Sequence, residues 1–364
     1  MSDDAPIVSF RGIEKTYDGR VNVVAALNLD IARGEFLTLL GPSGSGKTTT
    51  LMMLAGFEAP TAGEIFLAGR SLASVPAHKR SMGMVFQNYA LFPHMTVAEN
   101  LAYPLKRRRV PKAEIAAAIK RAVDMVKLTG LEARYPAQLS GGQQQRVAVA
   151  RALIFQPDLV LMDEPLGALD KNLREQMQLE LKHLHAQIGT TVVYVTHDQS
   201  EALTLSSRVA VFNDGRVQQL APPEDLYERP ENSFVANFVG ENNMLAGHVE
   251  ARDGDWCVVR LADGAEPIRA VAVNPGADGR TSVSIRPERL RLAREGSGDA
   301  AGNRLQVTVT ETIYFGDHVR LHARMGEAML MLKLPLADAP GLYAGAAVTL
   351  TCPPEFCRAL DPAS

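Results

Sequence analysis

The eight residues GPSGSGKT at positions 41–48 constrain the fold of this chain more than any other part of its sequence. They fit the pattern G-x-x-x-x-G-K-[ST], in which glycines let successive backbone N–H groups turn inward around phosphate oxygens. An apolar run at residues 36–40 precedes the motif, and a helical pattern follows it from about Lys47 to Gly56. This context favours a phosphate loop over the alternative, a glycine-rich turn without a ligand.

The residue types of the loop indicate how a nucleotide is held. The following helix adds the partial positive charge of its N-terminus to the ring of backbone donors. Lys47 is expected to reach the β- and γ-phosphates, and the hydroxyl of Thr48 to ligate Mg²⁺. The predicted ATP-binding residues of this segment are Gly41, Pro42, Ser43, Gly44, Ser45, Gly46, Lys47, Thr48 and Thr49.

A second motif, LVLMDE at residues 159–164, is an apolar run that ends in two carboxylates. A buried parallel strand would place Asp163 at the carboxyl edge of the sheet, beside a metal bound at the phosphate loop. We therefore expect Asp163 to be a second partner of Mg²⁺, through water, and Glu164 to polarise the attacking water. The alternative is a strand that simply ends in solvated acids.

A third motif, LSGGQ at residues 139–143, is another turn that leads into a helix and can bind an anion. One chain needs only one such corner for one nucleotide. The economical explanation is that the residues of this second corner serve the ATP of another copy of the chain. These residues are Ser140, Gly141, Gly142 and Gln143.

With these motifs in this order, the chain resembles the nucleotide-binding subunit of an ABC transporter. The resemblance implies an ATPase that works as a head-to-tail dimer. It implies that Tyr17 stacks on adenine and that Gln87, in VFQNYALFPH, senses Mg²⁺ and the attacking water. It also implies that the GALD loop at residues 167–170 crosses the dimer interface. His197 would hold the γ-phosphate and, with Lys47 and Mg²⁺, meet its charge during transfer. Taken singly, Tyr17, Gln87 and His197 have ordinary structural explanations.

The coarse pattern of the chain predicts two domains. Apolar strands at residues 160–163 and 191–195, with helical spacing at 112–128 and near 171–187, indicate a mostly parallel sheet covered by helices. The resemblance implies an α/β P-loop NTPase with a RecA-like core, an antiparallel β subdomain and a helical subdomain at residues 88–138. After about residue 240, short Val- and Leu-rich runs alternate with Gly, Asp and Pro turns, which predicts a small all-β barrel or sandwich. We expect an ATP-binding domain at residues 1–240 and an OB-like accessory or regulatory domain at residues 241–364.

The C-terminal part points to import. Residues 284–293, SIRPERLRLA, resemble the Ile-Arg-Pro-Glu stretch in the accessory domain of importer ATPases. Exporters usually fuse this ATPase to a membrane domain, whereas no apolar run here reaches the ~18 residues of a membrane span. The resemblance implies a peripheral subunit on the cytoplasmic face of the bacterial inner membrane, bound to two permeases and working with a periplasmic or extracellular solute-binding protein. The amino-acid sequence of the motif regions is most similar to that of the polyamine (spermidine/putrescine) subfamily. Importers of ferric ion, sulfate, phosphonate and sugars remain alternatives.

Composition excludes several other classes. The net charge of −3 gives no reason to expect a nucleic-acid partner. The three cysteines suit a reducing compartment, and their spacing disfavours a zinc site. A soluble ABC ATPase of DNA repair or translation is a weaker alternative, because the chain has one cassette and no sustained heptads. The motif LSGGQ disfavours ordinary P-loop kinases and GTPases.

Overall fold

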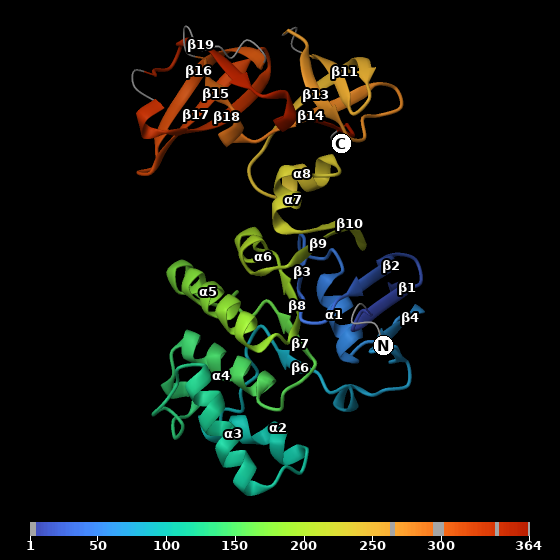
Figure 1. The fold of residues 1–364 in the computed structure, drawn as a ribbon, viewed down its shortest axis with the longest axis vertical. Helices are drawn as coiled ribbons and strands as arrows, with labels where there is room; N and C mark the ends of the chain where they lie inside the picture. The colour runs from blue at the N-terminus through green and yellow to red at the C-terminus, as the bar shows by residue number, and fades with distance from the viewer. Residues whose placement is uncertain (1–4, 263–265, 294–301, 339–341, 363–364) are drawn as a thin grey trace. The chain divides into compact units, whose positions relative to one another are not determined.

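The computed structural model describes residues 5–262, 266–293, 302–338 and 342–362. The chain forms two compact units, Met1–Pro223 and Glu224–Ser364, which we call the first unit and the second unit (Figure 1). Among the described residues, the helices fall short of the length and apolar character that a membrane span needs.

A six-stranded sheet forms the centre of the first unit, in the strand order β10-β9-β3-β8-β7-β6. All neighbouring pairs are parallel except β9 and β10. Because parallel strands end at the same edge, the segments that follow β3, β6, β7 and β8 meet there. The strands are β3 (Phe36–Leu40), β6 (Gly83–Val85), β7 (Leu159–Asp163), β8 (Thr191–Thr196), β9 (Arg208–Asn213) and β10 (Arg216–Ala221).

Alternate residues of the buried strands point into two different cores. Leu37, Leu161 and Val193 pack with α1 (Lys47–Ala55) on one face of the sheet. Their neighbours on the opposite face pack with α5 (Lys171–Ile188) and α6 (Gln199–Leu205). Apolar runs without alternation, such as residues 159–162, follow from burial on both faces and confirm the predicted helix-covered sheet.

An antiparallel sheet borders the face that carries α1. Its strand order is β2-β1-β4-β5, and its apolar side shares a core with α1. The strands are β1 (Val8–Thr16), β2 (Asn22–Ile31), β4 (Ala62–Leu67) and β5 (Arg70–Ser71).

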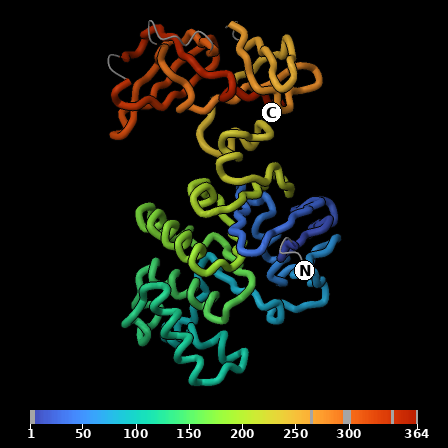
Figure 2. The backbone as a smooth tube through the Cα atoms, viewed as in Figure 1, coloured from blue at the N-terminus to red at the C-terminus, as the bar shows by residue number. Residues whose placement is uncertain are grey.

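Three helices form a separate cluster within the first unit. They are α2 (Val97–Arg107), α3 (Lys112–Met125) and α4 (Gly141–Leu153), and Figure 2 shows this part of the chain gathered together, away from the antiparallel sheet. Leu101, Val123 and Val147 share one small core. Thr96 and Glu99 start α2 with reciprocal side-chain bonds, a sequence signal for a helix N-terminus. The cluster extends to α4, beyond the residues 88–138 that were expected to form the helical subdomain.

The second unit is all β apart from short helices. A closed barrel has the order β11-β12-β13-β20-β14, and a five-stranded sheet has the order β15-β19-β16-β17-β18. The two share one apolar core, so the predicted small β domain is confirmed as a barrel joined to an open sheet. The strands are β11 (Asn243–Asp253), β12 (Trp256–Leu261), β13 (Ile268–Ala272), β14 (Arg280–Ile285), β15 (Arg291–Leu292), β16 (Asn303–Tyr314), β17 (His318–Met325), β18 (Ala328–Pro335), β19 (Ala347–Cys352) and β20 (Arg358–Leu360).

Two short helices before the barrel belong to the second unit. They are α7 (Pro223–Glu228) and α8 (Ser233–Phe238). The buried guanidinium of Arg286 donates to the carbonyl oxygens of Tyr227 at 2.8 Å, Ala236 at 3.0 Å and Glu241 at 3.2 Å, which ties both helices to the barrel. The second unit therefore begins at Glu224, earlier than the expected domain boundary at residue 240.

Candidate functional site

The phosphate loop occupies the turn between β3 and α1. A Cβ atom at Gly41 would collide with the carbonyl oxygen of Phe212, and one at Gly46 would lie 2.5 Å from the carbonyl oxygen of Val23. Gly46 also has a left-handed backbone with φ of 100°, immediately before the first turn of α1. Glycine is therefore required at both positions, and the loop brings backbone N–H groups and the helix N-terminus to one concave corner.

Lys47 is held beneath this loop. Its side chain is buried, and its ammonium donates to the carbonyl oxygens of Gly41 and Pro42, both at 2.7 Å, and to the Ser45 hydroxyl at 3.3 Å. Burial lowers the pKa of Lys47, and the nearby carboxylates of Glu164 and Asp163 act in the opposite direction. A cation fixed in this position is placed to meet phosphate charge at the loop.

Thr48 and Asp163 bring two oxygen ligands together at the end of the sheet. The Thr48 hydroxyl on α1 donates to Oδ1 of Asp163, the last residue of β7, at 3.2 Å. Burial raises the pKa of Asp163, and the neighbouring Glu164 adds to this effect. Burial disfavours the negative charge of this carboxylate, and a bound cation would offset that cost. Hydroxyl and carboxylate oxygens are ligands that Mg²⁺ prefers, so this pair could hold the metal.

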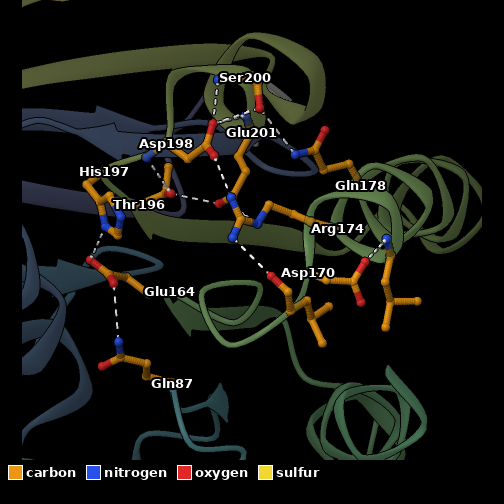
Figure 3. A network of polar contacts seen from close by, with 12 residues as sticks. Gln87, Glu164, Asp170, Arg174, Gln178, Thr196, His197, Asp198, Ser200 and Glu201 are labelled. Carbon is orange, nitrogen blue, oxygen red and sulfur yellow. Dashed lines mark hydrogen bonds and ion pairs between the residues drawn. The ribbon is translucent and has the colours of Figure 1, made fainter. Parts of the chain in front are cut away.

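Figure 3 shows Glu164 between His197 and Gln87, joined to each by a polar contact. Its Oε1 lies 3.0 Å from Nδ1 of His197, and its Oε2 accepts a hydrogen bond from the Gln87 amide at 3.4 Å. The backbone of Glu164 is left-handed, with φ of 43°, and its N–H donates to the carbonyl oxygen of Val195 at 3.0 Å. This geometry turns the carboxylate toward residues that follow β6 and β8. A carboxylate held between an imidazole and an amide can accept a proton from water.

The turn at residues 139–143, which the sequence predicts as a second anion-binding corner, leads into α4. The Ser140 hydroxyl accepts a hydrogen bond from the Gln143 N–H at 3.3 Å, and the Gln143 side chain accepts one from the Ser140 N–H at 3.0 Å. This capping box starts α4 and leaves Ser140 and Gly141 exposed. Within the part of the chain that the structure describes, no hydrogen bond joins residues 140–143 to residues 41–48.

Two further predicted segments border the site. Tyr17 is 62% exposed, and its ring centroid lies 4.8 Å from the Lys15 ammonium. It belongs to the turn between β1 and β2, whose next strand touches the phosphate loop at Val23. In the loop at residues 167–170, the Asp170 carboxylate starts α5 by accepting from the Leu173 N–H at 3.0 Å.

An ion-pair network beside the site was not predicted from the sequence. Arg174 donates to Asp198 at 3.1 Å and to the carbonyl oxygen of Leu169 at 3.0 Å, which joins the 167–170 loop to the turn that carries His197 (Figure 3). Asp198 also starts α6 by accepting from the Ser200 N–H at 2.8 Å. The only sequence signal is Asp198 itself, the last residue of VTHD, at a position typical of a helix N-cap.

Two family models match the chain. Residues 24–167 match the ABC transporter family, and residues 283–360 match the TOBE domain. The first match covers the phosphate loop, Gln87, the turn at residues 139–143 and Glu164. The second lies within the second unit and includes the end of β14, all of β16 and the closing strand β20.

The chain is similar along most of its length to curated transport ATPases. It is 48% identical to the spermidine/putrescine import ATP-binding protein PotA of Rubrobacter xylanophilus over 358 residues, which cover 97% of this chain and 93% of that protein. It is 50% identical to the protein of the same name from Acidothermus cellulolyticus, over 86% of this chain and 82% of that one.

Solved structures give the same result for the first unit. CbiO1 from Clostridium perfringens, part of the ABC transporter complex cbiONQ, aligns with a TM-score of 0.58 and 26% identity, over 61% of this chain and 91% of its own. The ATP-binding cassette MJ0796 was solved in a dimeric post-hydrolysis state bound to ADP and Pi. It aligns with a TM-score of 0.53 and 34% identity, over 59% of this chain and 98% of its own. These findings confirm the resemblance and the P-loop fold that the sequence predicted. The chain belongs to the family of ATP-binding, ATP-hydrolysing proteins of ABC transporters, and it carries a C-terminal TOBE domain.

Proposed function

We propose that the chain is the ATP-hydrolysing motor of an importer for polyamines, spermidine or putrescine, across the cytoplasmic membrane. The observation that carries this proposal is the 48% identity to a spermidine/putrescine import ATP-binding protein over 97% of the chain. Several further relatives with that printed function are 42–50% identical to this chain. The second candidate is import of another solute, because the solute itself need not touch this subunit.

The working unit in this proposal is a head-to-tail dimer. The chain has two anion-binding corners, at residues 41–48 and 140–143, that are not hydrogen-bonded to each other among the described residues. A second copy, turned end to end, would bring residues 140–143 of one chain onto the nucleotide held by Lys47 of the other. The dimeric state of the MJ0796 cassette supports this arrangement.

Each residue of the site then has a role in hydrolysis. Lys47 and the loop amides hold the β- and γ-phosphates, and Tyr17 stacks on the adenine. Mg²⁺, held by Thr48 and Asp163 with the Gln87 side chain nearby, would neutralise charge on the phosphates. Glu164 accepts a proton from the attacking water while His197 and Gln87 keep its carboxylate in place. Loss of the γ-phosphate removes a group that both chains bind, so the dimer opens.

The helical part of the first unit is the proposed contact with the membrane permeases. Residues 88–138 follow Gln87 directly, so a change at the nucleotide has a short path to this surface. The chain would then work as a peripheral subunit at the cytoplasmic face, bound to two permeases and served by an external solute-binding protein. The second unit would be an accessory domain that regulates or supports this assembly.

Uptake in the source bacterium tests the proposal. Disruption of the gene should abolish energy-dependent uptake of labelled spermidine or putrescine, while uptake of sulfate, ferric ion and sugars stays unchanged. The wild-type gene should restore uptake, and a Lys47→Ala gene should not. If polyamine uptake survives and uptake of another solute is lost, the polyamine assignment is wrong and the second candidate holds.

A further inference from the structure

The segment that follows Gln87 has a strained backbone. Tyr89 and Ala90 are consecutive non-glycine residues with left-handed conformations, φ of 61° and 45°. Each such residue costs on the order of 1–3 kcal/mol and persists only where the surrounding structure holds it. The strain lies two and three residues after the amide that contacts Glu164, so whatever holds this turn also helps to place Gln87.

The side chain that holds the turn is Arg151, in the last turn of α4. Its two terminal nitrogens donate to successive carbonyl oxygens, Nη2 to Tyr89 at 2.9 Å and Nη1 to Ala90 at 2.8 Å. The same guanidinium lies 5.6 Å from the ring centroid of Phe92. A planar fork can satisfy two adjacent carbonyls at once, which a lysine ammonium cannot do with the same geometry.

A second polar side chain fixes the far end of the segment. Asn100 on α2 is fully buried, and its amide accepts from the Phe92 N–H at 2.9 Å. It also donates to the carbonyl oxygens of Phe92 at 3.2 Å, Met95 at 3.1 Å and Thr96 at 3.0 Å. The backbone between Gln87 and Phe92 is therefore held at its far end by Asn100. Arg151 fixes its middle, at the carbonyl groups of Tyr89 and Ala90.

We infer that Arg151 is a positioning residue that couples Gln87 to the turn at residues 140–143 through helix α4. The helix is 13 residues long, or about 20 Å, with Ser140 at its first end and Arg151 near its last. A displacement of the Ser140 end is passed by a rigid helix to Arg151, and from there to the turn after Gln87. The inference rests on the proposed dimer, in which Ser140 touches the partner's ATP and Gln87 serves the chain's own ATP. Each α4 would then link the two nucleotide sites.

The kinetic test uses Arg151→Gln, Gln87→Ala and the double variant. Arg151→Gln should lower kcat for ATP about tenfold or more, because small misplacements near the reacting atoms are costly. The KM for ATP should stay within about twofold, since the residues of the phosphate loop are unchanged. In the Gln87→Ala background, Arg151→Gln should change kcat by less than about twofold, as expected when one residue acts through the other. Arg33→Gln, at an exposed arginine in the turn between β2 and β3, is the matched control and should behave as wild type.

Two further variants separate positioning from general stability. Arg151→Lys keeps the positive charge but loses the two guanidinium nitrogens that bind adjacent carbonyls. Its kcat should therefore lie between that of Arg151→Gln and that of wild type. Ala90→Gly removes the cost of the left-handed backbone and should partly restore kcat in the Arg151→Gln protein. Thermal unfolding of each variant records stability separately. Independent, additive losses in the double variant, or no rescue by Ala90→Gly, would overturn the inference.

The inference and the proposed dimer can fail separately. Dimer formation by the Glu164→Gln protein with ATP and Mg²⁺ tests the head-to-tail arrangement alone. If no dimer forms, the link between two nucleotide sites is lost, whatever the kinetics show. If the dimer forms but Arg151→Gln and Gln87→Ala are additive, the dimer stands and the positioning role of Arg151 is wrong.

Discussion

Oε1 of Glu164 lies 3.0 Å from Nδ1 of His197, across the ends of two neighbouring parallel strands. The side chain of Glu164 is 21% exposed and that of His197 is 58% exposed, so water can reach both. The contact occupies Nδ1 of the imidazole, so Nε2 is the ring nitrogen left for a second hydrogen-bond partner such as a phosphate group. The contact therefore fixes the direction of the carboxylate and leaves the histidine able to bind a second group.

Glu164→Gln should abolish turnover while leaving ATP binding intact. The amide keeps the shape of the side chain but cannot accept the proton of the attacking water, so kcat should fall by about 10²-fold or more. ATP would persist between two chains, and the dimer should accumulate. ATPase rates and light scattering with ATP and Mg²⁺ measure the two effects. Unchanged turnover would remove Glu164 from its proposed role.

Ser140→Ala should lower hydrolysis with little effect on nucleotide binding by the monomer. The hydroxyl would contact the partner's phosphates, and loss of one such donor costs about 10²-fold in comparable sites. Because Ser140 also caps α4, the substitution should cost about 1 kcal/mol of stability. Ser140→Asp is the control: aspartate caps a helix equally well, but its charge repels phosphate, so the protein should be stable and inactive. A loss of monomer binding in Ser140→Ala would contradict the role in the second chain's site.

Tyr17→Ala should raise the KM for ATP about tenfold with little change in kcat. Stacking of a base on an aromatic ring contributes about 1–3 kcal/mol, and the exposed ring of Tyr17 has no core role to lose. Tyr17→Trp keeps the stacking surface and should bind ATP as tightly as wild type. Equal KM values in all three proteins would show that the adenine lies elsewhere.

Arg80→Met should destabilise the nucleotide-free protein by about 3 kcal/mol. Arg80 is 9% exposed, and its guanidinium donates to four backbone carbonyls, at Met53, Leu54, Leu72 and Val75. Methionine fills much of the same space but leaves these acceptors without their donor, two of them in the last turn of α1. Urea unfolding measures the loss. Arg33→Met, at an exposed position, should stay within about 0.5 kcal/mol of wild type.

The free energy of unfolding of Glu201→Gln, relative to that of wild type, should increase as pH rises. Glu201 is 2% exposed, and burial raises its pKa above 4.5 although Tyr194 and Thr196 both donate to it at 2.7 Å. A carboxyl with a raised folded-state pKa stabilises the fold below its unfolded pKa, and that stability is lost as pH rises through the folded value. Glutamine does not titrate.

The measurement is urea unfolding at several values between about pH 4 and pH 8. The stability of Glu201→Gln relative to wild type should increase across the range above pH 4.5. The exposed Glu175→Gln on α5 serves as the control and should show a flat difference. A flat or falling difference for Glu201→Gln would mean that Glu201 is charged in the fold at little cost.

The elements that carry the nucleotide site were predictable because their signals are local. The glycines and Lys47 of the phosphate loop, the strand that ends at Asp163 and the serine that caps α4 each depend on residues within one short segment. Strand and helix assignments at residues 160–163, 171–187 and 191–195 were confirmed with small shifts of their ends, since apolar periodicity is also a local signal.

The arginine contacts were not predictable from the sequence. Arg151 binds carbonyls 61 and 62 residues away, and Arg286 binds helices about 50 residues earlier in the chain. An acceptor that is a backbone carbonyl leaves no residue type to recognise, so nothing in the sequence pairs the two partners. The same limit applies to the second unit. The alternation of apolar residues predicted its strands, but it did not distinguish a barrel from a sandwich, because strand pairing depends on contacts distant in sequence.

The barrel of the second unit is closed by β20, the last of its strands in the sequence and therefore the last to be synthesised. β20 pairs with both β13 and β14, so each of these strands has one unpaired edge until residues 358–360 are in place. At ordinary rates of protein synthesis, roughly 4 to 15 seconds separate the completion of β14 from that of β20. During this interval the nascent chain exposes two open strand edges, which are sites where other chains can add. A binding site for a chaperone, or an early misfolding event in overexpressed protein, is therefore expected at β13 and β14.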